Sequence, residues 1–415
     1  PGAGPADRGH VTVVPLPAAA RPAMFMALEA PAVRSRTVIL PLPSGELAAA
    51  VKAFRDRYGI PGLQVAILWA DGRSWTARGG FSDVAGRVRP TEGTSFSVGS
   101  VTKTFVATLI LQLVEAGRFS LDDRVAPLLP GVTVGRKPID PRITVRHLLS
   151  HTSGLDDYFS NPTIDRALIA EKATAWSPTR TLAYVRRPDF EPGAGWSYSN
   201  TNFVLLGLLA ERTTGRPLAE LLRSRFFDPL GLTSTFLQGA EPPVGPVAHA
   251  YRFASRSASA TPIDLADGSG LAPFTSVVTA AGAAGAVASS AVDLVHWARA
   301  LYAGSVLPPT LLAAMEDPTT ATGGRTDLYG LGMRRNVIGG SLALGHSGRL
   351  AGAWVSMRYF PAYGFAIAVT TNQYRTNPER LVATLVPLAA RVVWNPSGPV
   401  AGPEATTGTA AGLLR

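Results

Sequence analysis

The sequence predicts an α+β fold, with one mostly antiparallel sheet of five or more strands, flanking helices and a separate all-helical subdomain. Strand-like runs gather near residues 63–77 and again at 341–371, and helical patterns with Pro-containing turns fill the long stretch between them. If strands from both ends share one sheet, the stretch between them forms a region of its own. The chain has 415 residues, 46% of them hydrophobic, which is enough for a large buried core.

The first part of the sheet comes from two neighbouring strands that follow a helix. Residues 45–58 have the apolar spacing of a helix, and residues 63–68 read as a strand. Asp71-Gly72 is a hairpin signal before a second strand that starts at Ser74. These two strands are therefore expected to pair in an antiparallel manner.

The second part of the sheet comes from the C-terminal third of the chain. Three strand-like runs occur at 341–345, 354–360 and 365–371, and a turn over 361–364 joins the last two. An amphipathic helix follows at 378–394. The first and last helices of the chain are expected to cover the sheet.

The pattern divides the chain into an organised part and two ends. The ends are rich in Pro, Ala and Gly without a stable period, which favours an extended or disordered arm and a flexible tail. The expected divisions are an arm over 1–44, an α/β subdomain over 45–114 and 280–395, a mainly helical subdomain over 115–279 and a tail over 396–415. We expect the active site between the two subdomains.

The composition excludes several classes of function. Cysteine is absent, so disulfides, thiol catalysis and cysteine-based metal sites are excluded. The net charge of +10 comes from scattered arginines without a basic run interleaved with aromatic residues, so we expect no nucleic-acid partner. No apolar run is long enough to span a bilayer. We expect no cofactor and no metal. The chain starts without a methionine or a signal-peptide pattern, as a processed or trimmed protein would.

A candidate nucleophile stands where a strand-like run ends at Gly99 and an apolar helix begins at Ser100. At a helix N-terminus, orphan N–H groups favour developing negative charge. Lys103 lies one turn on, on the same face, which places a possible base beside a serine. Most S-x-x-K tetrads are exposed helix starts. Here, however, lysine occurs at only four positions in an arginine-rich chain, and lysine is the cation that can lose its proton.

Two further polar motifs stand near predicted elements. Tyr198 and Asn200 precede an apolar helix, where they could serve chemistry or simply cap the helix. His346, in the tripeptide His-Ser-Gly after a strand, could be a proton donor or a core histidine. His147 and His151 have the spacing of metal ligands, but without the Glu of H-E-x-x-H the pattern favours a helix with two hydrogen-bonded histidines.

Taken together, the motifs S-V-T-K (100–103), Y-S-N (198–200) and H-S-G (346–348) resemble those of serine β-lactamases and penicillin-binding proteins of class C type. Within that family the chain is most similar to soluble D-alanyl-D-alanine carboxypeptidases of Streptomyces type. The likeness covers roughly residues 45–395 and includes the stretches VGSVTKTF, ITVRHLLSHTSGL, YSNTNF, AGAVASS and YGLGMRR.

The resemblance implies a role for each motif residue. Ser100 forms an acyl-enzyme, Lys103 and Tyr198 move its proton, and His346 assists Tyr198 and the leaving group. Asn200 orients the lysine and binds the acyl-side amide of the substrate.

The resemblance also implies an oxyanion hole formed by the backbone N–H groups of Ser100 and Arg349. It further implies that the substrate binds in extended form along the edge of the H-S-G strand, next to Gly348, through backbone hydrogen bonds. Arg334 matches an arginine that holds the substrate carboxylate in the carboxypeptidases, and Ser347 supplies a hydroxyl. Two positions depart from the pattern. Arg349 replaces the usual threonine, and Ala280 replaces an aromatic residue expected to line the pocket, which implies a wider site.

The expected function is a serine hydrolase or acyltransferase of D-alanyl-D-alanine carboxypeptidase type, acting on small D-amino-acid peptides or peptidoglycan-like substrates and inhibited by β-lactams. The alternatives are an esterase, a D-amino-acid amidase or aminopeptidase, a peptide-cyclising thioesterase, and a non-catalytic cell-wall or penicillin-binding module. We expect a secreted or extracytoplasmic bacterial protein, with a cytoplasmic location left open. The oligomeric state is not predicted.

Overall fold

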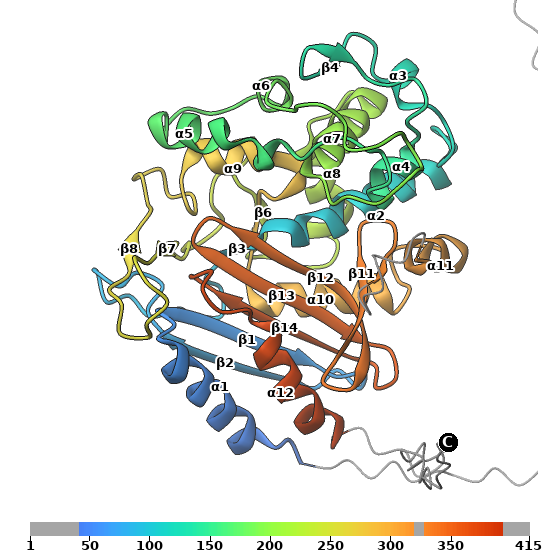
Figure 1. The fold of residues 1–415 in the computed structure, drawn as a ribbon. Helices are drawn as coiled ribbons and strands as arrows, with labels where there is room; N and C mark the ends of the chain where they lie inside the picture. Colours follow the sequence, from blue (N-terminus) through green and yellow to red (C-terminus); the bar gives the residue numbers. More distant parts are fainter. Residues whose placement is uncertain (1–40, 319–327, 393–415) are drawn as a thin grey trace, which may run out of the picture. The chain divides into compact units, whose positions relative to one another are not determined.

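A seven-stranded antiparallel sheet forms the centre of the computed structural model, which describes residues 41–318 and 328–392 (Figure 1). The strand order is β10-β11-β12-β13-β14-β1-β2, and every neighbouring pair is antiparallel. The strands are β1 (Gly62–Leu68), β2 (Ser74–Gly80), β10 (Leu328–Tyr329), β11 (Arg334–Ile338), β12 (Ser341–Leu350), β13 (Ala353–Phe360) and β14 (Phe365–Thr371). The predicted α+β class, with a sheet of at least five strands, is confirmed.

Both faces of the sheet are covered, and β1 shows how the sequence achieves this. All seven residues of β1 are buried. Because successive side chains point to opposite faces, Val65 and Ile67 join one apolar cluster while Ala66 and Leu68 join another. The first cluster includes residues of α1 (Ser44–Tyr58) and α12 (Glu379–Ala390), and the second includes residues of α10 (Ala291–Tyr302) and α2 (Thr102–Glu115).

Helices and loops fill the chain between β3 and β9. The helices are α3 (Val125–Leu128), α4 (Val145–Ser150), α5 (Pro162–Ala170), α6 (Pro178–Leu182), α7 (Asn200–Thr214), α8 (Leu218–Leu222) and α9 (Thr275–Ala281), with short turns η2 (Tyr158–Ser160), η3 (Arg223–Phe227) and η4 (Gly282–Ala284). Two small hairpins, β4 (Thr133–Val134) with β5 (Lys137–Pro138) and β7 (Tyr251–Arg252) with β8 (Ile263–Asp264), complete this part, and α11 (Pro309–Glu316) follows α10. In Figure 1, α2 lies between these helices and the sheet.

A second, three-stranded sheet positions the start of α2. Its order is β3 (Phe96–Ser97), β9 (Val287–Ser289) and β6 (Phe236–Leu237). Val98 N donates a hydrogen bond to Val287 O at 3.0 Å, and Val287 N donates to Thr102 Oγ1 at 3.0 Å. The segment between β3 and α2 is therefore fastened at both ends.

Helix α2 is anchored in the core by aromatic rings. Phe105 stacks on Trp297 of α10 with 4.1 Å between ring centroids, and it meets Phe227 edge-on at 5.5 Å. Trp297 Nε1 donates to Thr104 Oγ1 at 2.9 Å, so this buried indole is satisfied. Among the described residues, no helix is long and apolar enough to cross a membrane.

Several predicted boundaries were wrong. Strand β12 continues to Leu350, because residues 346–350 go on pairing with β13, so the H-S-G motif lies inside the strand and not after it. Helix α7 begins at Asn200, so Asn200 lies inside the helix that it was expected to precede. The short strands β10 and β11 were not predicted as strands. The predicted arm over 1–44, apart from its last residues, and the tail over 396–415 lie outside the described residues.

Candidate active site

Ser100 lies in a 3₁₀ turn, η1 (Gly99–Val101), between β3 and α2. The helix expected to begin at Ser100 therefore starts with one tighter turn. Gly99 has φ +50°, and a Cβ there would lie 2.7 Å from Arg349 N. Glycine is thus needed both for the backbone conformation and for the close approach of η1 to β12. Ser100 is half-buried at the start of the helix, where the helix dipole favours incoming negative charge.

Lys103 is fully buried and its Nζ has three oxygen neighbours. It lies 2.7 Å from Asn200 Oδ1, 2.7 Å from Ala284 O and 3.2 Å from Ser100 Oγ. The first two are carbonyl oxygens, which can only accept, so they take two N–H groups. In the charged form the third N–H donates to Ser100, and in the neutral form the lone pair faces the Ser100 hydroxyl. The geometry therefore suits a base for this serine.

The environment of Lys103 favours loss of its proton. Burial is the main reason that its pKa falls from 10.5 to about 7; the charge of Asp157 raises the pKa and that of Arg334 lowers it. The rings of Tyr198 and Phe203 lie 5.0 and 5.3 Å from Nζ and keep water from this side. A substantial fraction of the lysine is therefore neutral near pH 7.

Tyr198 covers the lysine just before α7. Burial raises the pKa of Tyr198, and the Ser100 hydroxyl opposes this shift. The Tyr198 hydroxyl interacts with Ser100 too loosely to count as a hydrogen bond, and it has no other partner in the described part of the chain. A buried, unpaired hydroxyl beside the nucleophile is suited to pass a proton to a bound substrate.

Asn200 is the first residue of α7 and connects the lysine to a carboxylate. Its Oδ1 accepts from Lys103, and its Nδ2 donates to Asp157 Oδ2 at 2.9 Å. Ser199 occupies the N-cap position without a capping side-chain bond, and its Oγ donates to Asp156 O at 3.2 Å.

His346 is buried in β12 and its partners define its tautomer. Nδ1 lies 2.5 Å from Ser347 O, a carbonyl that can only accept, so Nδ1 carries the proton. Burial lowers the pKa of His346 well below its usual value, and the charges of Arg334 and Lys103 add to this. In the neutral ring Nε2 is an acceptor, and it lies 3.1 Å from Tyr329 Oη. The Tyr198 ring is 6.2 Å from the histidine ring, so Tyr329 is the hydrogen-bonded neighbour.

The two predicted oxyanion donors lie where η1 touches β12. A Cβ on Gly348 would lie 1.7 Å from Val98 O and 2.8 Å from Ser100 N, so the two backbones are in direct contact. Strand β11 pairs with β12 only as far as Gly345. The segment 346–350 thus has no strand of the described sheet on that side. This free edge, with Arg349 N next to Gly99, stands beside the nucleophile.

The two candidate arginines occupy different places. Arg334, paired with Gly345 across the sheet, has its guanidinium 5.6 Å from the Tyr198 ring and 5.5 Å from the Tyr329 ring. Arg349 is exposed, and its guanidinium lies 5.4 Å from the Trp354 ring and 5.8 Å from the Tyr374 ring. Arg334 is therefore close to the reacting groups, whereas Arg349 faces outward. Ser347, between them along the chain, is half-buried.

A cleft of about 710 Å³ extends from the site and is partly apolar and partly charged. Its lining includes Asn200 and Arg349 together with Phe159, Asp165, Leu168, Ile169, Lys172, Arg252, Ile263, Asp264, Leu265, Phe274, Val277, Leu350, Ala351 and Tyr374. Ala280 is not part of this lining. It is buried in α9, where its carbonyl accepts from Tyr158 Oη at 2.9 Å. The expectation that residue 280 faces the pocket was wrong, because that side of α9 packs inward.

His147 and His151 do not face a common metal site. His147 caps the start of α4, where its Nδ1 accepts from Thr144 N at 3.3 Å. His151 is buried after α4, and its Nδ1 accepts from Ser199 N and from Asn202 Nδ2, both at 3.2 Å. The reading as hydrogen-bonded histidines is confirmed. The His151 ring lies 4.4 Å from the Tyr198 ring, so it packs against this candidate catalytic tyrosine.

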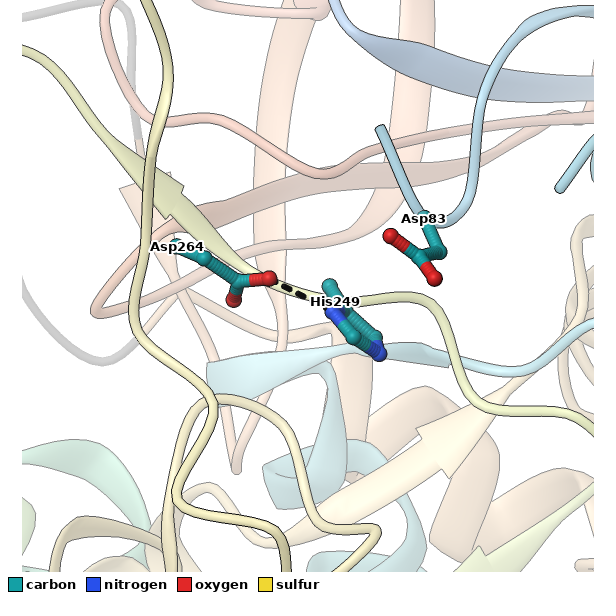
Figure 2. A group of neighbouring side chains, drawn as sticks. All are labelled: Asp83, His249 and Asp264. Atoms are coloured by element: carbon teal, nitrogen blue, oxygen red, sulfur yellow. Dashed lines mark hydrogen bonds and ion pairs between the residues drawn. The ribbon is translucent and has the colours of Figure 1, made fainter. Parts of the chain in front are cut away.

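A second group of titratable side chains stands at the β7–β8 hairpin (Figure 2). Asp83, His249 and Asp264 have possible ligand atoms within 4.8 Å of one another. His249 Nδ1 is hydrogen-bonded to Asp264 Oδ2 at 2.7 Å. This bond connects the segment before β7 to β8, which borders the cleft. The group is partly exposed, and its hydrogen bond between His249 and Asp264 is a structural contact of the hairpin.

Comparison with known proteins places this geometry in a family. The β-lactamase family model matches residues 47–391. The chain belongs to the β-lactamase family. It is 30% identical to penicillin-binding protein 4 of Amycolatopsis lactamdurans over 337 residues, which cover 77% of this chain and 83% of that protein.

Two further relatives are D-specific hydrolases. The chain is 28% identical to a D-aminopeptidase of Gluconobacter oxydans over 367 residues, 88% of this chain and 66% of the length of that relative. The solved structure of a D-stereospecific amidohydrolase from Streptomyces sp. matches with a TM-score of 0.69 and 32% identity, over 82% of this chain and 96% of that one. This β-lactamase-family protein is therefore an enzyme of the serine hydrolase superfamily.

Proposed function

We propose that this enzyme is a serine amidohydrolase that forms an acyl-enzyme at Ser100 from peptides or amides of D-amino acids. The observation that carries the proposal is the position of Lys103 Nζ, between two carbonyl acceptors and 3.2 Å from Ser100 Oγ. That arrangement directs a neutral amine's lone pair at the nucleophile. The D-configuration is inferred from the D-stereospecific amidohydrolase and the D-aminopeptidase to which the chain is similar.

In the first half-reaction, the Ser100 hydroxyl gives its proton to Lys103 as its oxygen bonds to the scissile carbonyl carbon. The oxyanion accepts hydrogen bonds from the N–H groups of Ser100 and Arg349, each worth about 3 kcal/mol. The C–N bond then breaks, and the leaving amine takes a proton relayed from Lys103 through Tyr198. In the second half-reaction, water gives a proton to Lys103 along the same path as its oxygen bonds to the ester carbonyl carbon. The acyl C–Oγ bond then breaks, and Ser100 Oγ takes a proton back from Lys103.

The free edge of β12 supports the mode of substrate binding. An extended peptide that adds to residues 346–350 would have its main chain held by backbone hydrogen bonds. Asn200 keeps one Nδ2 hydrogen after bonding Asp157 and can donate it to the acyl-side carbonyl. The apolar part of the cleft suits a large side chain on the acyl side.

A second candidate is D-alanyl-D-alanine carboxypeptidase activity, which is favoured by one specific observation. Arg334 stands close to Tyr198, and a guanidinium there can hold the terminal carboxylate of a peptide through paired hydrogen bonds. Arg349 offers a second cation at the cleft. The esterase and thioesterase readings need no such carboxylate ligand. We further propose β-lactams as acylating inhibitors and an extracytoplasmic location.

Intact-protein mass after incubation with benzylpenicillin tests the nucleophile. We expect the mass to rise by one penicillin molecule on the wild type and not on Ser100→Ala. Unmodified protein with intact penicillin would leave β-lactam binding without support, and hydrolysed penicillin without adduct would instead indicate a β-lactamase.

The substrate class is tested by steady-state rates on the matched p-nitroanilides of D- and L-alanine. Acetyl-D-Ala-D-Ala and p-nitrophenyl acetate are measured in the same series. We expect turnover of the D-anilide well above that of the L-anilide. Release of D-alanine from the dipeptide would favour the carboxypeptidase. Turnover of the ester alone would contradict the amidohydrolase proposal.

A further inference from the structure

We propose that Asp157 is a positioning residue for the acylation step, which fixes the orientation of the Asn200 amide and sets the pH range in which Lys103 can act as a base. This inference rests on the proposed function. Neither the predicted motifs nor the mechanism above assigns Asp157 a role.

The contacts form an unbroken chain from Asp157 to the nucleophile. Asp157 Oδ2 accepts from Asn200 Nδ2 at 2.9 Å, and Asn200 Oδ1 accepts from Lys103 Nζ at 2.7 Å. Lys103 Nζ in turn lies 3.2 Å from Ser100 Oγ. Asp157 is half-buried and lies immediately before η2.

A carboxylate at this place determines which end of the amide faces Lys103. An ionised carboxylate only accepts, so Asn200 must present its Nδ2 to Asp157 and its Oδ1 to the lysine. With the amide turned around, Nδ2 would face Lys103 Nζ and remove one of the two acceptors that occupy the lysine's N–H groups. The lone pair of the neutral amine would then no longer be directed at Ser100.

The charges of Asp157 and Arg334 shift the pKa of Lys103 in opposite directions. The negative charge raises the pKa of Lys103 against the effect of burial, while the positive charge of Arg334 lowers it. Burial raises the pKa of Asp157 itself, and the charge of Lys103 opposes that shift. The titratable groups near this pair include the neutral rings of Tyr158, Tyr198, His151 and His346, and the adjacent Asp156 is paired with Arg186.

Asp157 also has a structural role, which uses its other oxygen. Oδ1 accepts from Phe159 N at 3.1 Å and caps η2. A cap alone does not need a charge, because Asn and Ser cap as well as Asp. The two roles can therefore be separated by substitution: Asp157→Asn and Asp157→Ser keep a capping oxygen and remove the charge. Asp165→Asn, which removes a carboxylate from the wall of the cleft that Asn200 lines, is the matched control.

Lysine NMR provides a test that needs no substrate. The chain has only four lysines, at 52, 103, 137 and 172, so a ¹³C-lysine sample gives four side-chain signals, and the one absent in Lys103→Met is assigned to Lys103. We expect its titration midpoint to fall by on the order of one pH unit in both Asp157 variants, as is usual when an opposite neighbouring charge is removed. The Asp165→Asn midpoint should match that of the wild type.

Acylation kinetics complete the test. The acid limb of kcat/KM should move to lower pH in step with the NMR midpoint, and kcat at the plateau should fall because Asn200 is free to turn. An unchanged midpoint in both variants would overturn the proposal and leave Asp157 as a cap. A rise in KM alone would overturn it too and make Asp157 a substrate contact. A wild type without turnover would refute the proposed function, while the midpoint still decides the role of Asp157.

Discussion

Gly348→Ala tests the predicted oxyanion hole, because Gly348 is where β12 meets the turn that carries the nucleophile. The added Cβ would lie 1.7 Å from Val98 O, and real Cβ atoms essentially never come closer than 3.0 Å. Relief of this contact needs a shift of about 1.3 Å, the difference 3.0 − 1.7. Both partners are backbone, so no flexible side chain can give way. The shift must separate η1 from β12.

That separation would move Ser100 N away from its place beside the strand, where the second predicted donor, Arg349 N, is fixed. Loss of one oxyanion donor lowers the rate about 10²- to 10³-fold, and a misplacement of about 1 Å alone can cost about 10²-fold. We therefore expect the acylation rate constant to fall by about 10²- to 10³-fold while Ser100, Lys103 and Tyr198 remain present.

Pre-steady-state release of p-nitrophenol from an activated ester measures acylation directly. Circular dichroism and thermal unfolding establish that the variant is folded. Gly45→Ala is the matched control, since no atom lies within 4 Å of a Cβ at that position. Acylation by folded Gly348→Ala at a rate close to that of the wild type would refute both the contact and the oxyanion assignment.

Four further predictions concern other parts of the site and the core. Because Lys103 must be neutral to accept a proton and its pKa is about 7, kcat/KM for acylation should rise with pH and level off above pH 7, with a value at pH 6 about tenfold below the plateau; a flat profile from pH 5 to 8 would contradict this. Tyr198→Phe should lower kcat about 10²- to 10⁴-fold without loss of thermal stability, because the hydroxyl has no structural partner in the described chain. Arg349→Ala keeps the backbone N–H, so it should reduce kcat/KM for substrates with a carboxylate and spare their amides; equal losses on both would exclude a charge contact. Phe105→Ala should lower the free energy of unfolding by about 3–5 kcal/mol, measured by urea denaturation, since the ring is fully buried against Trp297.

The sheet could be predicted largely from the sequence because its strands carry a clear signal. The continuous apolar run of β1, which is buried throughout, and the turns next to β2 and β14 are local features that can be read directly from the sequence. Strands β10 and β11 were missed because they are short and half-exposed, and they form only through pairing, β10 with β11 and β11 with β12. The extension of β12 past Gly345 was missed because Gly, Ser and Arg have weak strand preference, and the pairing with β13 outweighs it.

The site was predictable where chemistry depends on residue type and not where it depends on long-range contacts. Ser100 and Lys103 are three residues apart on one helical turn, so their proximity follows from local geometry. Asp157 comes from a segment that carries no motif, and Tyr329 opens the stretch YGLGMRR without having been a candidate site residue. Only tertiary packing places them against Asn200 and His346. The partner contributed by Ala284 is a backbone carbonyl, for which no side chain gives a signal.

The charge distribution of the site explains why two arginines and a neutral histidine can serve one reaction. His346 holds its proton on Nδ1 toward Ser347 O, and its low pKa keeps the ring uncharged. The third motif therefore brings no cation into the space near Lys103. A positive charge there would disfavour the protonated lysine that forms when Lys103 takes a proton. Arg334 supplies a positive charge close to Tyr198, and Asp157 balances it from the opposite side through Asn200. Arg349 stands at the exposed wall of the cleft, so a substitution there can alter the proposed contact with substrate charge while the groups around Lys103 stay in place.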